Sequence, residues 1–131
     1  MDLIQSAQEV RNNAYAPYSG YPVGAALEDA QGRIFTGVNV ENISFGATIC
    51  AERCAIAKMV SVGSRKIVRI AIATIDGGIP CGICLQTILE FASDPTTLEV
   101  ITVDDSHHQR AFQLSELIPF GFHSSEVHRT E

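Results

Sequence analysis

The stretch IVRIAIATIDGGIPCGIC, residues 67–84, decides the fold. Its first part, IVRIAIATI, is almost continuously apolar, which is typical of a strand buried on both faces of a sheet. Residues 76–80 form turns, and the proline at their end favours a helix over residues 81–91. A second apolar strand is predicted at residues 98–103, so strand, helix and strand form a crossover that joins parallel strands.

The flanking sequence predicts the rest of an α/β fold. Apolar residues at helical spacing indicate an amphipathic helix over residues 2–14, and a second helix is predicted over residues 48–62. Between them, apolar runs at residues 23–28 and 33–38 surround a glycine-containing turn, which indicates a β-hairpin. The chain is therefore expected to be one three-layer α/β/α domain, residues 1–131, with a mixed sheet of about five strands. A last strand and a helical turn are predicted at residues 109–114 and 115–118.

The charge and hydropathy of the chain exclude several classes of function. The net charge is −6, and the nine basic residues are scattered, whereas binding to nucleic acid or to a membrane surface needs clustered Lys and Arg. No apolar stretch is long enough for a membrane span, and the N-terminus does not have the pattern of a signal peptide. We therefore expect a cytoplasmic protein, in which the four cysteines are ligands or buried thiols and not disulfides.

Two cysteine motifs carry the chemistry. Cys50-Ala51-Glu52 opens one predicted helix, and Pro80-Cys81-Gly82-Ile83-Cys84 opens the next. Cys81 and Cys84 lie on one helical turn, so both sulfurs can reach the same ion, and Cys50 can complete the set if the two helix N-termini lie side by side. Three protein ligands leave the fourth position of zinc open, as in catalytic sites. The motifs predict one zinc ion per chain.

Two charged residues next to Cys50 fit this chemistry. A helix N-terminus favours thiolates because its N–H groups and its dipole present positive charge. Three thiolates leave the zinc site with about one net negative charge, which Arg53 is placed to offset. Glu52 lies two residues from a ligand, where a carboxylate can accept a proton and return it. A ligand-x-Glu motif followed by Pro-Cys-x-x-Cys resembles the layout of zinc deaminases.

Over residues 14–122 the chain resembles the small cytidine deaminase family, whose members convert cytidine and deoxycytidine into uridine and deoxyuridine with release of ammonia. This resemblance implies a role in pyrimidine salvage. Five segments occur in the family's order. They are Ala16-Pro17-Tyr18-Ser19, Val23-Gly24-Ala25-Ala26-Leu27, Asn39-Val40-Glu41-Asn42, Cys50-Ala51-Glu52-Arg53, and Pro80-Cys81-Gly82 with Cys84 and Gln86.

The resemblance also implies roles for single residues. Asn39 and Glu41 match the residues that hold the ribose hydroxyls, and the backbone of Ala51 with the Glu52 side chain matches the contacts to the pyrimidine edge. Phe122 matches an aromatic residue that reaches a neighbouring subunit's site. Members of this length are usually homotetramers, so a homo-oligomer is expected, a tetramer or a dimer.

The sequence departs from the family pattern at three positions. Tyr21 stands where Phe is common near the substrate, Phe45 where Tyr is frequent, and Leu85 where Arg usually follows the last cysteine. These changes leave open a modified aminopyrimidine nucleoside, or a nucleoside antibiotic of the blasticidin type, as the substrate.

Other readings remain open at this stage. Cys54 fits a buried thiol, although a four-cysteine structural zinc site without catalysis is an alternative, and a polynucleotide substrate is another. From the residues alone, Asn39 and Glu41 could also be turn formers. Polar surroundings predict that the histidines are on the surface; these are His107, His108, His123 and His128.

Overall fold

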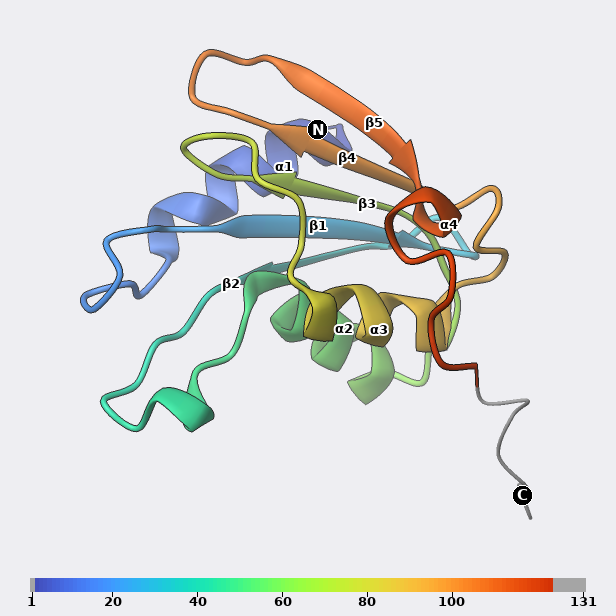
Figure 1. The fold of residues 1–131 in the computed structure, drawn as a ribbon, viewed down its shortest axis with the longest axis horizontal. Coiled ribbons are helices and arrows are strands. Elements are labelled where there is room, and N and C mark those ends of the chain that lie inside the picture. The colour runs from blue at the N-terminus through green and yellow to red at the C-terminus, as the bar shows by residue number, and fades with distance from the viewer. Residues whose placement is uncertain (1, 124–131) are drawn as a thin grey trace.

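The apolar run becomes β3 (Ile67–Ala73), the central strand of a five-stranded sheet (Figure 1). A computed structural model describes residues 2–123 of the chain. β3 pairs antiparallel with β1 (Gly24–Asp29) and parallel with β4 (Glu99–Val103). The sheet is mixed, as predicted. Its edges are β2 (Ile34–Val38) and β5 (Gln109–Gln113), each antiparallel to its neighbour.

Helices cover both faces of the sheet, which confirms the three-layer prediction. Figure 1 shows α1 (Leu3–Val10) on one face and α2 (Ala51–Ser61) with α3 (Gly82–Phe91) on the other. α1 begins at a capping box in which Asp2 accepts from the backbone of Gln5, a contact that satisfies first-turn N–H groups. Three shorter helices are η1 (Arg11–Asn13), η2 (Phe45–Ala47) and α4 (Leu114–Leu117).

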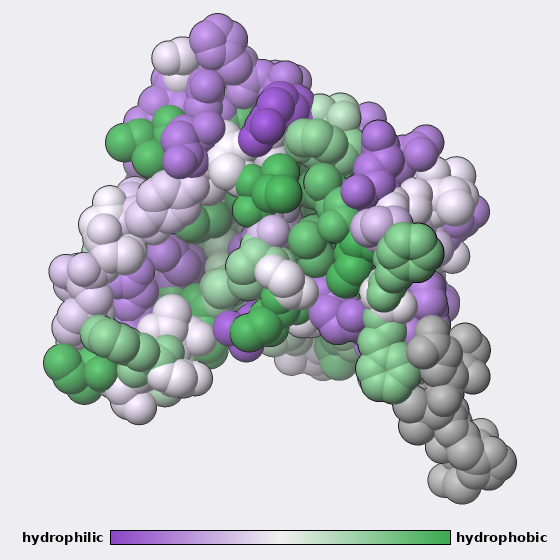
Figure 2. All heavy atoms as spheres, viewed as in Figure 1, coloured by the Kyte–Doolittle hydropathy of each residue, from purple (hydrophilic) through white to green (hydrophobic). Residues whose placement is uncertain are grey.

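Two apolar cores hold these layers together. The larger core lies between the sheet and α2 and α3, where Leu27, Met59, Ile70 and Ile88 are fully buried. Each such side chain contributes about 1.5–3 kcal/mol by leaving water. The core under α1 is built mainly from small residues such as Ala7, which keeps that helix close to the sheet. In Figure 2 hydrophobic residues gather over the middle of one face, while the end of the β4–β5 hairpin is hydrophilic.

Two glycines let the helices approach the strands at the backbone itself. A Cβ on Gly37 of β2 would lie 2.4 Å from the Ala55 nitrogen and 2.5 Å from the Ala51 oxygen. A Cβ on Gly24 of β1 would lie 2.2 Å from the Ala7 oxygen. Because real Cβ contacts are never this short, only glycine allows α2 and α1 to lie at these depths. Gly37 thereby sets the position of the N-terminal half of α2.

A buried carboxylate holds the end of the β1–β2 hairpin. Asp29 is 1% exposed and accepts hydrogen bonds from the Arg33 guanidinium, the Ser64 hydroxyl and two backbone N–H groups. Burial raises the pKa of Asp29, but the hydrogen bonds from Arg33 and Ser64 outweigh it, so its pKa is below the ordinary value.

The main difference from the predicted elements is the start of the second helix. It begins at Ala51 and not at residue 48, because Cys50 has an extended backbone (φ −73°, ψ 154°) as the N-cap. Among residues 2–123, no helix is both long and apolar enough to cross a membrane.

Candidate active site

Three cysteine sulfurs converge where two helices begin. Cys50 is the N-cap of α2, Cys81 is the N-cap of α3, and Cys84 lies in the first turn of α3. Their Sγ atoms all lie within 4.8 Å of one another. Thiolates bound to one tetrahedral zinc at about 2.3 Å are separated by about 3.8 Å, so the cluster fits this ion with little movement. Three soft sulfur donors also favour zinc over magnesium or calcium.

The surroundings of the cluster favour a thiolate at Cys50. Hydrogen bonding from Cys84 lowers the pKa of Cys50 to about 5, with Arg53 contributing in the same direction against the effect of burial. The same hydrogen bond, together with burial, raises the pKa of Cys84. The Arg53 Nη2 atom lies 3.9 Å from the Cys50 sulfur and donates to the Thr48 carbonyl at 3.2 Å. Arg53 therefore places a positive charge next to the Cys50 sulfur.

Glu52 lies in the first turn of α2 and is only 5% exposed. Burial raises its pKa to about 7, and the neighbouring Cys50 thiolate acts in the same direction. Its own backbone N–H and the Arg53 charge oppose this shift. A carboxyl group with a pKa near neutrality can both accept and release a proton, which suits general acid–base catalysis.

The cysteines and Glu52 open into a pocket of about 440 Å³, a volume typical of small-molecule sites. Ala51, Asn39, Glu41 and Tyr21 line it. The resemblance predicts that these residues bind substrate, and that role stays a prediction. The sequence assigned no binding role to the other lining residues, which are Ser19, Val23, Thr48, Ile72, Thr74, Gly78, Ile79 and Pro80. Several of these follow β3 and precede Cys81, and this position is the one sequence signal that could have indicated them.

Asn39 and Glu41 also hold the pocket wall. Asn39 accepts from the Val23 N–H and donates to the Tyr21 carbonyl, both at 2.9 Å. Glu41 accepts from the Ser19 hydroxyl and from the backbone N–H groups of residues 18 and 19. The Ser19 hydroxyl in particular lowers the pKa of Glu41, which keeps it ionised. An amide and a carboxylate can make further hydrogen bonds, so both residues keep capacity for a ligand.

Two predicted substrate residues do not line this chain's own pocket. Phe45 is 74% exposed and packs edge-on against Tyr18, with ring centroids 6.1 Å apart. Phe122 is 58% exposed, and its backbone exchanges two hydrogen bonds with the Gln86 amide. A contact between Phe122 and a second chain, which the resemblance implies, would be compatible with this exposed position.

Cys54 and the described histidines are not members of the cluster. Within residues 2–123, the group of potential metal ligands consists of three cysteines and does not include Cys54, which is partly buried. His107 bonds Gln8, and His108 pairs with Asp104; both side chains are on the surface, as is His123. His128 lies outside the described residues. Leu85 packs in the larger core.

Comparison with known proteins shows similar sequences and structures over most of the chain. The family profile described as the cytidine and deoxycytidylate deaminase zinc-binding region matches residues 1–99. A cytidine deaminase of Mycoplasma genitalium is 40% identical over 126 residues, which cover 94% of this chain and 95% of the relative. A crystal structure of the cytidine deaminase from Burkholderia pseudomallei has a TM-score of 0.85 at 40% identity, covering 92% of this chain and 96% of that one. The cytidine deaminase of Mycobacterium tuberculosis gives a TM-score of 0.78 at 34% identity, covering 92% and 94%.

Proposed function

The chain belongs to the zinc-dependent cytidine deaminase family and catalyses hydrolytic deamination, and we propose that it acts on cytidine and deoxycytidine with the residues of this pocket. One observation supports this most directly: the three-cysteine cluster and the buried carboxyl of Glu52 open into the same pocket. Cys50, Cys81 and Cys84 would hold the zinc. When bound, zinc supplies a Lewis acid that makes water nucleophilic near neutral pH.

Glu52 moves the protons of the reaction. Its carboxylate accepts a proton from the attacking water and delivers it to N3 of the cytosine ring, while the water oxygen bonds to C4. Glu52 then passes the second proton of that water to the amino group, the C4–N bond breaks, and ammonia leaves. The same group acts as base and as acid, which its pKa of about 7 permits near neutral pH.

The other pocket residues bind the nucleoside in this proposal. Asn39 and Glu41 hold the ribose hydroxyls with the hydrogen-bonding capacity that the wall leaves free, and the Ala51 backbone contacts the pyrimidine edge. Tyr21 forms a wall of the pocket, and Arg53 offsets the charge of the thiolates.

We propose further that the protein is a homo-oligomer, a tetramer or a dimer, and that it works in the cytoplasm. Several large apolar side chains are exposed near the start of α3 and after α4: Ile83 at 66%, Phe120 at 97% and Phe122 at 58%. Contact with another copy would bury them and bring Phe122 to a neighbouring site, and the exposed Phe45 could be covered in the same way. The reducing cytoplasm would keep the cysteines as thiols.

Ammonia release from cytidine, deoxycytidine and modified aminopyrimidine nucleosides tests the proposal. Wild-type protein should release ammonia from the first two, and a chelator should stop the release. Glu52→Gln keeps the shape of the side chain but cannot carry protons, so kcat should fall by about 10²–10⁴-fold while zinc stays bound. Glu90→Gln, the same change on the exposed face of α3, is the matched control. Near-full turnover of Glu52→Gln would refute the role of Glu52, and release from modified nucleosides alone would refute the substrate assignment.

A further inference from the structure

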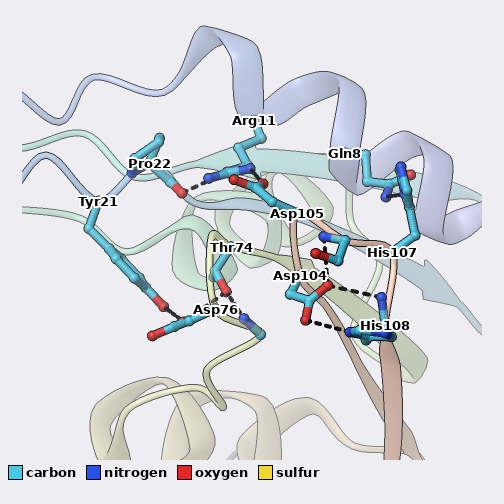
Figure 3. Close-up of polar contacts among 12 residues, drawn as sticks. Gln8, Arg11, Tyr21, Pro22, Thr74, Asp76, Asp104, Asp105, His107 and His108 are labelled. Atoms are coloured by element: carbon cyan, nitrogen blue, oxygen red, sulfur yellow. Dashed lines mark hydrogen bonds and ion pairs between the residues drawn. The ribbon is translucent and has the colours of Figure 1, made fainter.

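Two chain segments that are distant in sequence both contribute to the lining of the pocket, and Figure 3 shows Tyr21 of one segment beside Asp76 of the other. One is the segment of residues 18–23, whose Tyr21 ring lines the pocket. The other is the turn of residues 74–80, which connects β3 to Cys81. The Tyr21 hydroxyl donates to Asp76 Oδ1 at 2.6 Å and thereby joins the two segments.

Asp76 and Thr74 shape the turn from within, and two hydrogen bonds hold its carbonyls from outside: Arg110 donates to Gly77 at 2.7 Å, and the Asp105 N–H donates to Ile75 at 3.3 Å. Asp76 Oδ1 also accepts from the Gly78 N–H at 3.0 Å, and the Thr74 hydroxyl accepts from the N–H groups of Gly77 and Gly78 at 2.8 and 3.1 Å. These contacts shape the turn internally. Only the hydrogen bond from Tyr21 ties this carboxylate to the opposite wall among the contacts of the described residues.

The segment that carries Tyr21 is itself fixed from behind. Arg11 donates from Nε to the Pro22 carbonyl at 2.9 Å and pairs with Asp105, and Asn39 donates to the Tyr21 carbonyl. Figure 3 shows Arg11 and Asp105 on the α1 side of this arrangement, with the Tyr21 ring reaching from Pro22 toward Asp76. Because the backbone of Tyr21 is anchored, its hydroxyl is a fixed point for the turn.

Gly78 leaves space for this hydroxyl. A Cβ at position 78 would lie 2.9 Å from the Tyr21 oxygen and 3.3 Å from Asp76 Oδ1. An added methyl group would displace the end of the tyrosine side chain without requiring the backbone to move. The substitution Gly78→Ala is therefore a second, independent way to break the hydrogen bond between Tyr21 and Asp76.

We propose that Tyr21 is a positioning residue whose hydroxyl, bonded to Asp76, clamps the turn of residues 74–80 against the substrate pocket. The inference rests on the proposed function, because it concerns how that pocket receives a nucleoside. A turn that is already ordered in the free protein does not have to be ordered when the ligand binds, so the clamp favours binding. Cys81 is the N-cap of α3, and α3 packs on the larger core through Leu85 and Ile88, so we expect the clamp to act on binding more than on the chemical step.

The test compares Tyr21→Phe, Asp76→Asn and the double variant, with Tyr15→Phe as the control. Tyr15 is 55% exposed, and its hydroxyl has no hydrogen bond among the described residues. Losing a hydrogen bond to a carboxylate should raise KM for cytidine and the Kd for the product uridine by about 5–20-fold in Tyr21→Phe, with kcat within about 3-fold. If one contact is responsible, the double variant should be no worse than the more affected single variant.

Gly78→Ala extends the test. It should raise KM in the wild-type background and have much less effect in Tyr21→Phe, which lacks the oxygen that the methyl group displaces. Amide hydrogen exchange over residues 74–80 should be faster in Tyr21→Phe than in Tyr15→Phe, a readout that does not depend on turnover.

An active wild-type protein with unchanged KM and unchanged exchange in Tyr21→Phe would overturn the clamp. The clamp would also be overturned if the increase of KM in the double variant equalled the product of the increases in Tyr21→Phe and Asp76→Asn. It would be overturned as well if Gly78→Ala raised KM by the same factor in the wild type and in Tyr21→Phe. Failure of the wild type to release ammonia would instead refute the proposed function. The exchange measurement would then still decide whether Tyr21 orders the turn.

Discussion

Replacing Gly37 by Ala tests how the fold positions the active site. The new Cβ would lie 2.4 Å from the Ala55 nitrogen and 2.5 Å from the Ala51 oxygen, and 2.9 Å from the Cys54 Cβ. Two of these neighbours are backbone atoms of α2, which cannot rotate away. The helix must therefore move outward by roughly 1 Å to restore ordinary contact distances.

This displacement has two measurable costs. Overpacking against atoms that cannot rotate away costs about 3 kcal/mol, at the upper end of the usual range, which for this length lowers Tm by about 10–15 °C. The moved turn of α2 carries Ala51 and follows Cys50, so the cluster widens and the carboxyl of Glu52 shifts. A shift of this size can reduce turnover by about 10²-fold.

Thermal unfolding, zinc content and kcat/KM for cytidine should be measured on Gly37→Ala and on Gly46→Ala. No described atom lies within 4 Å of a Cβ at Gly46, so this second variant controls for the loss of a flexible residue. The control should match the wild type in all three measurements. If Gly37→Ala unfolds within about 2 °C of the wild type and keeps its zinc and turnover, then the strand does not set the position of α2.

Three further results are expected. Asp29→Asn should lose about 2 kcal/mol at pH 7, because it removes charged hydrogen bonds from Arg33 and Ser64. The pKa of Asp29 is lowered in the folded state, so its contribution to the free energy of unfolding is complete above the ordinary value of 3.8 and disappears as the pH falls through the folded pKa. The free energy of unfolding of Asp29→Asn, followed by circular dichroism, should therefore depend less on pH in that range than that of the wild type. Cys81→Ser should lose bound zinc while Cys54→Ser keeps it, and metal analysis that found equal losses would contradict the three-cysteine cluster. Chelation should lower Tm in wild type and in Cys54→Ser alike, and scanning calorimetry that gave equal Tm values with and without the chelator would count against coupling of zinc to stability.

The sequence predicted the elements whose signals are local. The apolar run predicted a strand over residues 67–75, and β3 covers Ile67–Ala73 of it; the Pro-Cys-x-x-Cys spacing placed both sulfurs at the first turn of α3. That Cys50 lies beside Cys81 and Cys84 could be predicted only by assuming that the two helix N-termini are adjacent, and the structure brings the three sulfurs together. The start of α2 was placed too early, because the extended conformation of Cys50 leaves no trace in the hydrophobic pattern.

The pocket walls were less predictable. Tyr21 and Asp76 are 55 positions apart, and no periodicity reports a hydrogen bond between side chains of two loops. Asn39 and Glu41 were expected to face a ligand, but their bonds to the segment of residues 18–23 could not be inferred, since they depend on how the loops cross. The contact of Gly37 with α2 could not be predicted either, because a glycine in a strand can also mark a bulge or a bend.

The first residues of the two helices have a consequence for the life of the protein in a cell. Cys50 and Cys81 occupy N-cap positions, yet among residues 2–123 neither side chain accepts a hydrogen bond from its own helix, as Ser or Asp would. Each helix thus begins without the stabilisation of a side-chain N-cap, and a zinc ion bound to these cysteines would stabilise the two helix starts instead. Zinc that binds only the folded chain lowers the fraction of unfolded molecules. Because proteases degrade unfolded molecules, less of the protein is then degraded. The steady-state amount of this enzyme should therefore rise and fall with the zinc supply.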